Sequence, residues 1–228
     1  SCDLFSGELS SPCARLTVVP MCLHVGGQDY PDLPELNIPE LLDKLAQYPS
    51  SSACPSPADF AGAFERGDRT VCFTLSSQLS GTYHAACIAR EMMDPEDATH
   101  IHLVDSLSAT VGERFLLLHA AALRDRGASA AEIAAELTEL RRRITIWASV
   151  DTLEYLCKGG RLSRTAAGVG SLAKVKPIIT LTREGRVAVQ KKCIGKSRCM
   201  SEITAAAVFT SETGQTYASP SVSVFFSA

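Results

Sequence analysis

The sequence predicts an α/β fold, in which a mostly parallel sheet domain with helices on both faces is followed by a smaller α+β domain. Two observations lead to this prediction. Short apolar runs of strand length alternate with helix-length amphipathic segments along the first two-thirds of the 228-residue chain. After residue 150 the pattern changes, because two strand-like runs flank a hairpin turn and one long helix follows them. We therefore expect an α/β domain over residues 1–150 and a smaller domain over residues 151–228.

Capping residues and apolar periodicity define the expected elements of the first domain. Ser56 precedes Pro57, and Ser129 precedes an acidic first turn, so both serines are expected to cap helices. Residues 49–57 are rich in serine and proline, a composition typical of a linker. The expected strands are residues 16–19, continued over 21–25, and then 70–75, 101–104 and 146–150, and the expected helices are residues 39–48, 57–67, 82–93, 109–126 and 130–143.

The second domain is expected to begin with a short helix that ends at Lys158-Gly159-Gly160-Arg161. The turn Arg183-Glu184-Gly185 predicts a hairpin between strands at residues 176–181 and 186–194, and a helix is expected to follow over residues 197–209. Residues 222–226 have the composition of a further strand and lie close to the last residue. We therefore expect this domain to be incomplete at its C-terminus.

Charge and hydropathy narrow the function classes. The formal net charge is −3, which creates no strong positive field for nucleic acid or for an anionic membrane. No apolar run approaches the roughly 20 residues that span a bilayer, so we expect no stable membrane insertion. The nine cysteines form no CxxC pair, which predicts free thiols in a reduced, cytoplasmic protein. We expect no cofactor and no metal site, because paired ligand spacings are absent from the sequence.

The strongest candidate site is a cluster of small hydroxyl residues where an expected strand ends and an expected helix begins. Ser76, Ser77, Ser80 and Thr82 lie in this stretch together with Gly81. Hydroxyls, free backbone N–H groups and the positive end of a helix dipole bind anions, and ligands of open α/β sheets lie at this edge. The alternative interpretation is ordinary capping of the next helix by Ser80.

Two other segments can contribute to an anion site. Serines at residues 50–52 also precede a helix, and two such clusters in one domain favour a shared polar pocket. Arg161 follows two glycines, which allow a close approach of its guanidinium to an anion. The alternative for this turn is a helix C-cap followed by a surface arginine, and the spacing alone favours that alternative.

A serine hydrolase is the alternative from another class of function. Its nucleophile would be Ser80, with His84 one helical turn later as the base and Asp105 at the end of the neighbouring strand. No Gly-x-Ser-x-Gly elbow is present, and a turn of helix places His84 away from the loop. Residues 168–173 match Gly-x-Gly-x-x-Ala but follow no strand, so they indicate close helix packing and not a dinucleotide site.

Taken together, the motifs resemble those of a known family. They occur in the order Ser76-Ser77-Gln78-Leu79-Ser80-Gly81-Thr82-Tyr83, Val104-Asp105-Ser106 and Lys158-Gly159-Gly160-Arg161. Over about residues 1–200 the chain is similar to the DegV family of fatty-acid-binding proteins. The resemblance implies two domains with a long-chain fatty acid between them and no catalysis by the protein itself. It also implies a partner, a separate fatty acid kinase that makes acyl phosphate for phospholipid synthesis.

The resemblance also implies ligand-binding residues when it is carried over by position. The hydroxyls of Ser52 and Ser80 would meet the carboxylate, with Ser77 and Gly81 in the same loop as Ser80. Arg161 would lie near the head group. The tail would occupy an apolar tunnel, at about 0.8 kcal/mol for each buried CH₂. Ser52 stands where the family usually has a threonine.

Overall fold

The structure is a computed structural model of the chain, and it describes residues 16–33, 35–167 and 175–212. The chain divides into two compact units, Ser1–Ile144 and Thr145–Ala228, and each unit has its own apolar core. The glycine motif at residues 168–173 and the expected strand at residues 222–226 lie outside the described residues.

Two parallel strands, β4 (Thr70–Thr74) and β5 (Ile101–Asp105), form the centre of the first unit. They pair residue for residue, so Thr74 lies opposite Asp105 where both strands end. Parallel strands need a crossover connection, and here α3 (Thr82–Glu91) and the short helix α4 (Pro95–Ala98) provide it. The carboxyl ends of both strands therefore meet at one edge.

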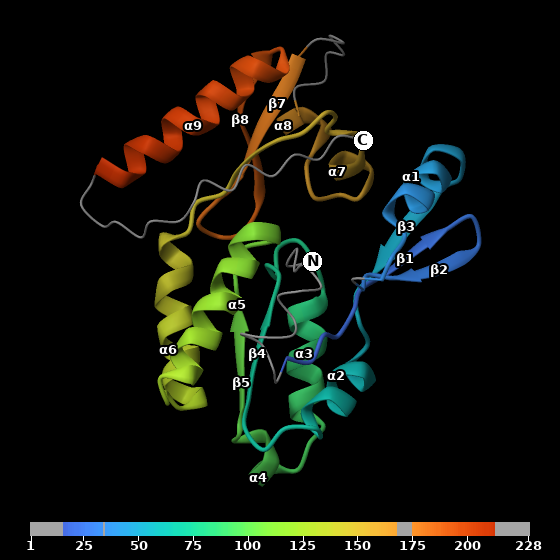
Figure 1. Cartoon of the computed structure of the whole chain (residues 1–228). Helices are drawn as coiled ribbons and strands as arrows, with labels where there is room; N and C mark the ends of the chain where they lie inside the picture. Colours follow the sequence, from blue (N-terminus) through green and yellow to red (C-terminus); the bar gives the residue numbers. More distant parts are fainter. Residues whose placement is uncertain (1–15, 34, 168–174, 213–228) are drawn as a thin grey trace. The chain divides into compact units, whose positions relative to one another are not determined.

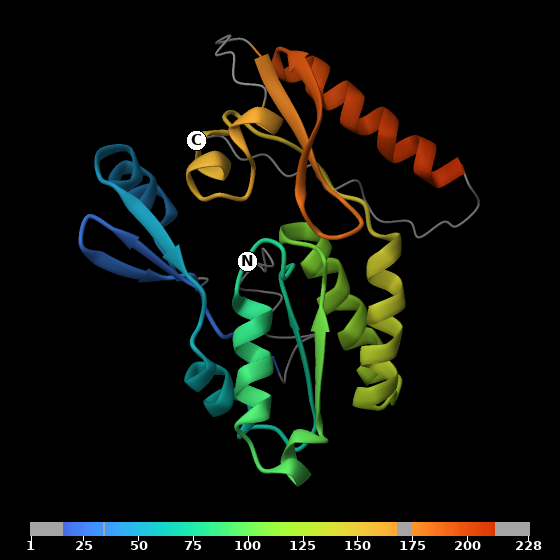
Figure 2. The same cartoon turned by 180° about the vertical axis from the view of Figure 1, so that it is seen from behind.

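Helices cover both faces of this strand pair, as Figure 1 and the reverse view in Figure 2 show. Neighbouring residues of a strand face opposite ways. Cys72 accordingly packs on a cluster that contains Phe60, whereas Phe73 packs on a cluster that contains Leu116 and Leu137. The α/β prediction with helices on both faces is thereby confirmed. The helices are α2 (Pro57–Phe64) and α3 (Thr82–Glu91) on one face, and α5 (Thr110–Asp125) and α6 (Ala130–Leu140) on the other.

Both predicted serine caps are present. The hydroxyl of Ser56 accepts a hydrogen bond from the N–H of Asp59, and Ser129 accepts one from Glu132; each acidic side chain binds back to its serine to complete a capping box. The helix expected over residues 130–143 ends its α-helical part at Leu140, and a 3₁₀ turn, η1 (Arg141–Arg143), follows.

A separate antiparallel sheet precedes the parallel pair. Its strand order is β2-β1-β3, and helix α1 (Ile38–Gln47) connects β2 to β3. Gly26 and Gly27 form the turn between β1 and β2, with φ angles of 58° and 79°. Positive φ at both central residues is what a two-residue hairpin turn of type I′ requires, and glycine adopts it without strain. The strands are β1 (Cys22–Val25), β2 (Gln28–Pro31) and β3 (Ser50–Ala53).

Two sequence-based predictions in this region are wrong. Residues 50–53, expected within a linker, form β3, because their backbone pairs with β1 while the serine side chains stay exposed. Residues 16–19, expected as a strand, belong to no strand of the described chain. Their apolar side chains are used in helix packing instead: Leu16 packs against Leu117 and Ala121 of α5, and Val19 packs on the cluster around Phe60.

The second unit contains a three-stranded antiparallel sheet of order β6-β7-β8. We expected β6 in the first domain, but it pairs with β7, Ala148 opposite Ile179, and so belongs to the second unit. Ile178, Cys193 and Cys199 form the core between the sheet and α9. No described helix is both long and apolar enough to cross a membrane. The elements are β6 (Trp147–Ser149), α7 (Glu154–Lys158), α8 (Arg164–Ala167), β7 (Val175–Leu181), β8 (Val187–Ile194) and α9 (Lys196–Glu212).

Candidate ligand-binding site

The hydroxyl loop, which we define as residues 76–82, connects the end of β4 to the first residue of α3. It lies where the carboxyl ends of two parallel strands meet, which is the edge at which α/β proteins bind ligands. Ser76 is fully buried, and Ser80 and Thr82 expose only 7% and 5% of their surface. Buried hydroxyls are costly unless they form hydrogen bonds, so these bonds determine the shape of the loop.

Ser76 folds the loop into a tight turn. Its carbonyl accepts hydrogen bonds from the N–H groups of Leu79 (2.9 Å) and Ser80 (3.2 Å), and its hydroxyl oxygen accepts one from Gln78 (3.2 Å). Serine is suited to this position because its short side chain can bind the backbone two residues later. The turn holds Ser77, Ser80 and Gly81 in one compact segment, and their role in ligand binding stays a prediction.

Ser80 and Thr82 face each other at the start of α3. Their hydroxyl oxygens are 2.8 Å apart, and the N–H of Thr82 also donates to the hydroxyl oxygen of Ser80 over 3.3 Å. The N-cap is Gly81, which has no side chain to bind the first turn of the helix. Ser80 thus performs part of the capping role, but two facing hydroxyls carry two protons and only one lies between them. The other can be donated to an anion.

Asp105 ties the hydroxyl loop to the end of β5. One oxygen of its buried carboxylate accepts hydrogen bonds from the N–H groups of Ser77 and Leu107, each over 3.1 Å. The N–H of Ser76 also donates to the carbonyl of Ser108 over 2.7 Å. The loops that follow β4 and β5 are therefore held together by both backbone and side-chain hydrogen bonds.

The loop after β5 has an unusual backbone and an unpaired buried hydroxyl. Leu107 and Thr110 have φ angles of 50° and 48°, in the left-handed region that costs non-glycine residues of order 1–3 kcal/mol. Ser108 is 97% buried, being 3% exposed, and its hydroxyl has no hydrogen-bond partner among the described residues. Strained backbone and an unsatisfied buried donor are features of functional sites.

Ser52 is placed on β3, where its side chain is exposed and opposite Leu23 of β1. The segment that follows β3 reaches the hydroxyl loop, because the Sγ atom of Cys54 lies 3.4 Å from the position a Cβ atom would take at Gly81. Ser52 is two residues before Cys54. No hydrogen bond of the described chain joins Ser52 to Ser80, so their joint role stays a prediction.

Arg161 lies in the second unit, directly after α7. Its guanidinium donates to the carbonyl of Gly159, and its backbone N–H donates to the carbonyl of Leu156 over 2.9 Å. Gly160 has a φ angle of 76°, which is typical of a helix that ends in a left-handed glycine. The local geometry is that of the C-cap alternative, and a role of Arg161 in ligand binding stays a prediction.

Comparison with known proteins identifies the family. The family model for uncharacterised proteins of the DegV family matches residues 13–223. The chain belongs to the DegV family. A DegV domain-containing protein of Clostridium acetobutylicum is 33% identical to this DegV chain over 205 residues, which cover 87% of the chain and 71% of that protein.

Solved structures of other DegV proteins have the same fold as this DegV chain. A DegV-family protein from Thermus thermophilus, whose structure concerns fatty acid binding, superposes with a TM-score of 0.81 at 31% identity; the match covers 92% of this chain and 75% of that one. The Fatty Acid Kinase (Fak) B3 protein of Streptococcus pneumoniae, solved with linoleic acid, superposes with a TM-score of 0.74 at 27% identity, over 86% of this chain and 70% of that one.

The geometry of this DegV chain gives the serine hydrolase alternative no support. Asp105 is directed toward backbone N–H groups, and His84 is exposed on α3. Among the described residues no hydrogen bond joins Ser80, His84 and Asp105. Burial raises the pKa of the nearby Cys72 thiol to about 12, so this side chain is also a poor nucleophile at neutral pH.

Ser108 is a candidate site residue of this DegV chain that was not predicted from the sequence. The sequence did place Asp105 and Ser106 at the end of a strand beside the one that ends at the hydroxyl loop. Because neighbouring parallel strands bring their following loops together, the next serine along the chain was the signal that could have found it.

Proposed function

We propose that this protein binds a long-chain fatty acid and presents its carboxylate to a separate fatty acid kinase in the cytoplasm. In this proposal the carboxylate is held at the hydroxyl loop by Ser80, with Ser77, Gly81 and the exposed Ser52 nearby. Arg161 contributes a positive charge, and apolar side chains enclose the acyl tail.

The observation that carries the proposal is that the hydroxyl loop after β4 and the loop after β5 are hydrogen-bonded to each other at the carboxyl ends of the two strands. Together they offer the Ser80–Thr82 hydroxyl pair, the first turn of α3 and the unpaired hydroxyl of Ser108. A carboxylate accepts hydrogen bonds and is stabilised at the start of a helix. The site therefore fits a small anionic head group that accepts several hydrogen bonds.

The similarity to other DegV proteins supports a fatty acid as the ligand. The Thermus thermophilus relative has a structure that concerns fatty acid binding, and the Streptococcus pneumoniae relative holds linoleic acid. The latter is also a component of a fatty acid kinase, which supports the proposed partner. In that scheme a carboxylate oxygen accepts the γ-phosphoryl group of ATP, and ADP leaves, on the catalytic subunit.

We propose that the chain itself performs no catalysis. Nucleophilic catalysis by Ser80 needs a base that takes its proton. The carboxylate of Asp105 instead accepts hydrogen bonds from the N–H groups of Ser77 and Leu107. The hydroxyl of Ser80 is hydrogen-bonded to the hydroxyl of Thr82. The hydroxyls hold the head group and do not attack it.

Native mass spectrometry of the purified protein tests the proposed ligand. After incubation with palmitate, we expect a complex with one palmitate per chain, and we expect hexadecanol, which has the same chain and no charge, to bind more weakly. A spectrum that shows only free protein at saturating palmitate would reject the proposal. If palmitate binds, addition of ATP and the kinase subunit from the same genome should yield acyl phosphate, and its absence would reject the proposed partner alone.

A further inference from the structure

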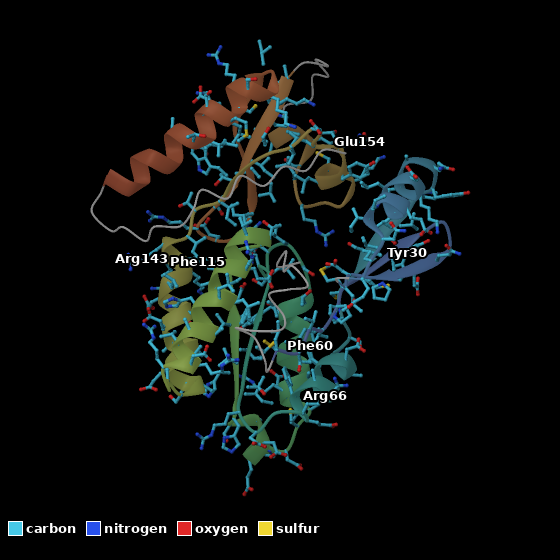
Figure 3. All side chains as sticks on the ribbon, in the orientation of Figure 1. Tyr30, Phe60, Arg66, Phe115, Arg143 and Glu154 are labelled. Carbon is cyan, nitrogen blue, oxygen red and sulfur yellow. The ribbon has the colours of Figure 1, made fainter. Side chains whose placement is uncertain are left out.

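A group of potential metal ligands lies on the hairpin of β1 and β2, apart from the residues proposed to hold the fatty acid. The Cys-His-Asp cluster consists of Cys22, His24 and Asp29, and one ligand atom from each lies within 4.8 Å of the others. Figure 3 labels Tyr30, which follows Asp29 on β2 and locates the hairpin. We propose that this cluster binds Zn²⁺.

The strand register brings the three side chains together. Cys22 and His24 are two residues apart on β1, so their side chains leave the same face of the sheet. Asp29 lies directly opposite His24 on β2, and opposed residues of antiparallel strands also share a face. The turn at Gly26 and Gly27 fixes this register, because a two-residue loop permits no slippage without a change in length.

The ligand types and distances suit zinc. Thiolate sulfur, imidazole nitrogen and carboxylate oxygen bind Zn²⁺ at about 2.0 to 2.3 Å, so that ligand atoms around a tetrahedral ion lie about 3.5 Å apart. The three ligand atoms lie within 4.8 Å of one another, close to this spacing. Nδ1 of His24 and Oδ1 of Asp29 are 2.5 Å apart in a hydrogen bond, so these two side chains would rotate about 1 Å apart to admit the ion between them. When Zn²⁺ binds, the proton shared by these two atoms and the thiol proton of Cys22 are both released to solvent.

The neighbouring strand leaves room for the ion. On β3, Ala53 lies opposite Cys22 and Ser51 lies opposite His24, so both side chains beside the cluster are small. The cluster is partly exposed, with 41% of the His24 side chain accessible, and water can fill the fourth position. A thiolate with an imidazole favours Zn²⁺ over Mg²⁺ or Ca²⁺, which prefer oxygen ligands alone.

Zinc at this position would connect β1 to β2 through side chains as well as backbone. β1 is the middle strand of its sheet, and its other neighbour is β3, which carries Ser52. An ion that binds only the folded hairpin stabilises it by RT ln(1 + c/Kd), where c is the free Zn²⁺ concentration, so the stabilisation grows with that concentration. The inference does not depend on fatty acid binding, and each can fail without the other.

Metal titration of the full chain tests this inference. We expect one equivalent of Zn²⁺ to bind, with a rise in melting temperature, and Co²⁺ at the same site to give a thiolate-to-metal charge-transfer band. Substitutions Cys22→Ala, His24→Ala and Asp29→Asn should each weaken Zn²⁺ binding at least 10-fold, and Cys22→Ala should abolish the charge-transfer band.

Matched controls come from ligand-type residues outside the cluster. Cys157→Ser and His100→Asn should leave the affinity for Zn²⁺ and the Co²⁺ spectrum unchanged, since neither side chain belongs to the cluster. Circular dichroism and the cooperativity of thermal unfolding show that each variant is folded. Equal zinc affinity in Cys22→Ala and in the native chain would overturn the inference. The absence of bound zinc when protein and Zn²⁺ are mixed in equal amounts, each well above micromolar, would also overturn it.

Discussion

The backbone N–H of Ser76 donates a 2.7 Å hydrogen bond to the carbonyl of Ser108, which joins the loop after β4 to the loop after β5. The carboxylate of Asp105 strengthens this link, because it accepts hydrogen bonds from the N–H groups of Ser77 and Leu107. A ligand that binds one of these loops is therefore expected to affect the position of the other loop as well.

Ser80→Ala should weaken palmitate binding. The substitution removes a hydroxyl that we place against a carboxylate, and a lost hydrogen bond to a charged group costs about 1–3 kcal/mol, or about 5- to 150-fold in affinity. Isothermal titration calorimetry with palmitate measures the change. Ser201→Ala, an exposed serine on α9, is the control and should bind as the native chain does. Equal affinities for both variants would remove Ser80 from the site.

Ser108→Ala should also weaken palmitate binding but should leave the free protein as stable as before. The hydroxyl of Ser108 has no partner in the described chain, so the folded state loses no hydrogen bond with it. Palmitate titration and urea unfolding of the same samples measure the two effects. A lower unfolding free energy with unchanged affinity would show that this hydroxyl serves the fold alone.

Ser106→Ala is the matched comparison for that variant, two residues away. Its buried hydroxyl donates to the carbonyl of Ser108 over 3.2 Å and accepts from the N–H of Ser108 over 3.1 Å. Its removal should lower the free energy of unfolding by about 1–3 kcal/mol, because a buried carbonyl and N–H lose a partner. We therefore expect Ser106→Ala to change mainly the free energy of unfolding and Ser108→Ala to change mainly the affinity for palmitate.

Arg161→Gln should weaken the binding of palmitate more than that of hexadecanol. The substitution removes a positive charge and keeps a polar, though shorter, side chain, so the charged ligand loses more attraction than the uncharged one. Because Arg161 is exposed, the melting temperature should change little. Competition between the two ligands, followed by native mass spectrometry, measures the ratio. If the ratio of palmitate affinity to hexadecanol affinity equals that of the native chain, Arg161 does not contact the head group and only serves the turn after α7.

The capping box at Ser129 should make stability depend on pH. Hydrogen bonds from the backbone and hydroxyl of Ser129 lower the pKa of Glu132 below its ordinary value of 4.5. A lowered folded-state pKa contributes stability above the ordinary value, and this contribution is lost as the pH falls through the lowered pKa. Ser129→Ala should therefore destabilise the chain at neutral pH and less so in acid. Urea unfolding at several pH values measures the difference; a constant difference would contradict this assignment.

The sequence predicted elements well where local chemistry decides them. The caps at Ser56 and Ser129 were recognised because a serine followed by a proline or by an acidic first turn, and then by a helical pattern, is a local signal. The hydroxyl loop was recognised for the same reason. Its hydroxyl and glycine residues lie in one continuous stretch, so no knowledge of the tertiary structure was needed.

The sequence failed where pairing across the chain decides the structure. Residues 50–53 have the composition of a linker, yet β1 lies beside them and supplies hydrogen-bond partners for their backbone. The Cys-His-Asp cluster has no recognisable spacing, because it is created by the register that places Asp29 opposite His24. Recognition of Gly26-Gly27 as a tight hairpin turn would have predicted that register.

The left-handed backbone at Leu107 and Thr110 lowers the stability of the folded chain but holds the loop after β5 in one shape. Replacement of either residue by glycine would relieve a backbone strain of about 1–3 kcal/mol, which exceeds the roughly 0.5–1 kcal/mol that the freedom of glycine in the unfolded chain costs. The same change would let the loop after β5 sample other shapes, so that Ser108 would have to be ordered again each time a ligand arrives. A variant library ranked by melting temperature alone should therefore enrich glycine at these two positions, and we expect the enriched variants to release fatty acid faster.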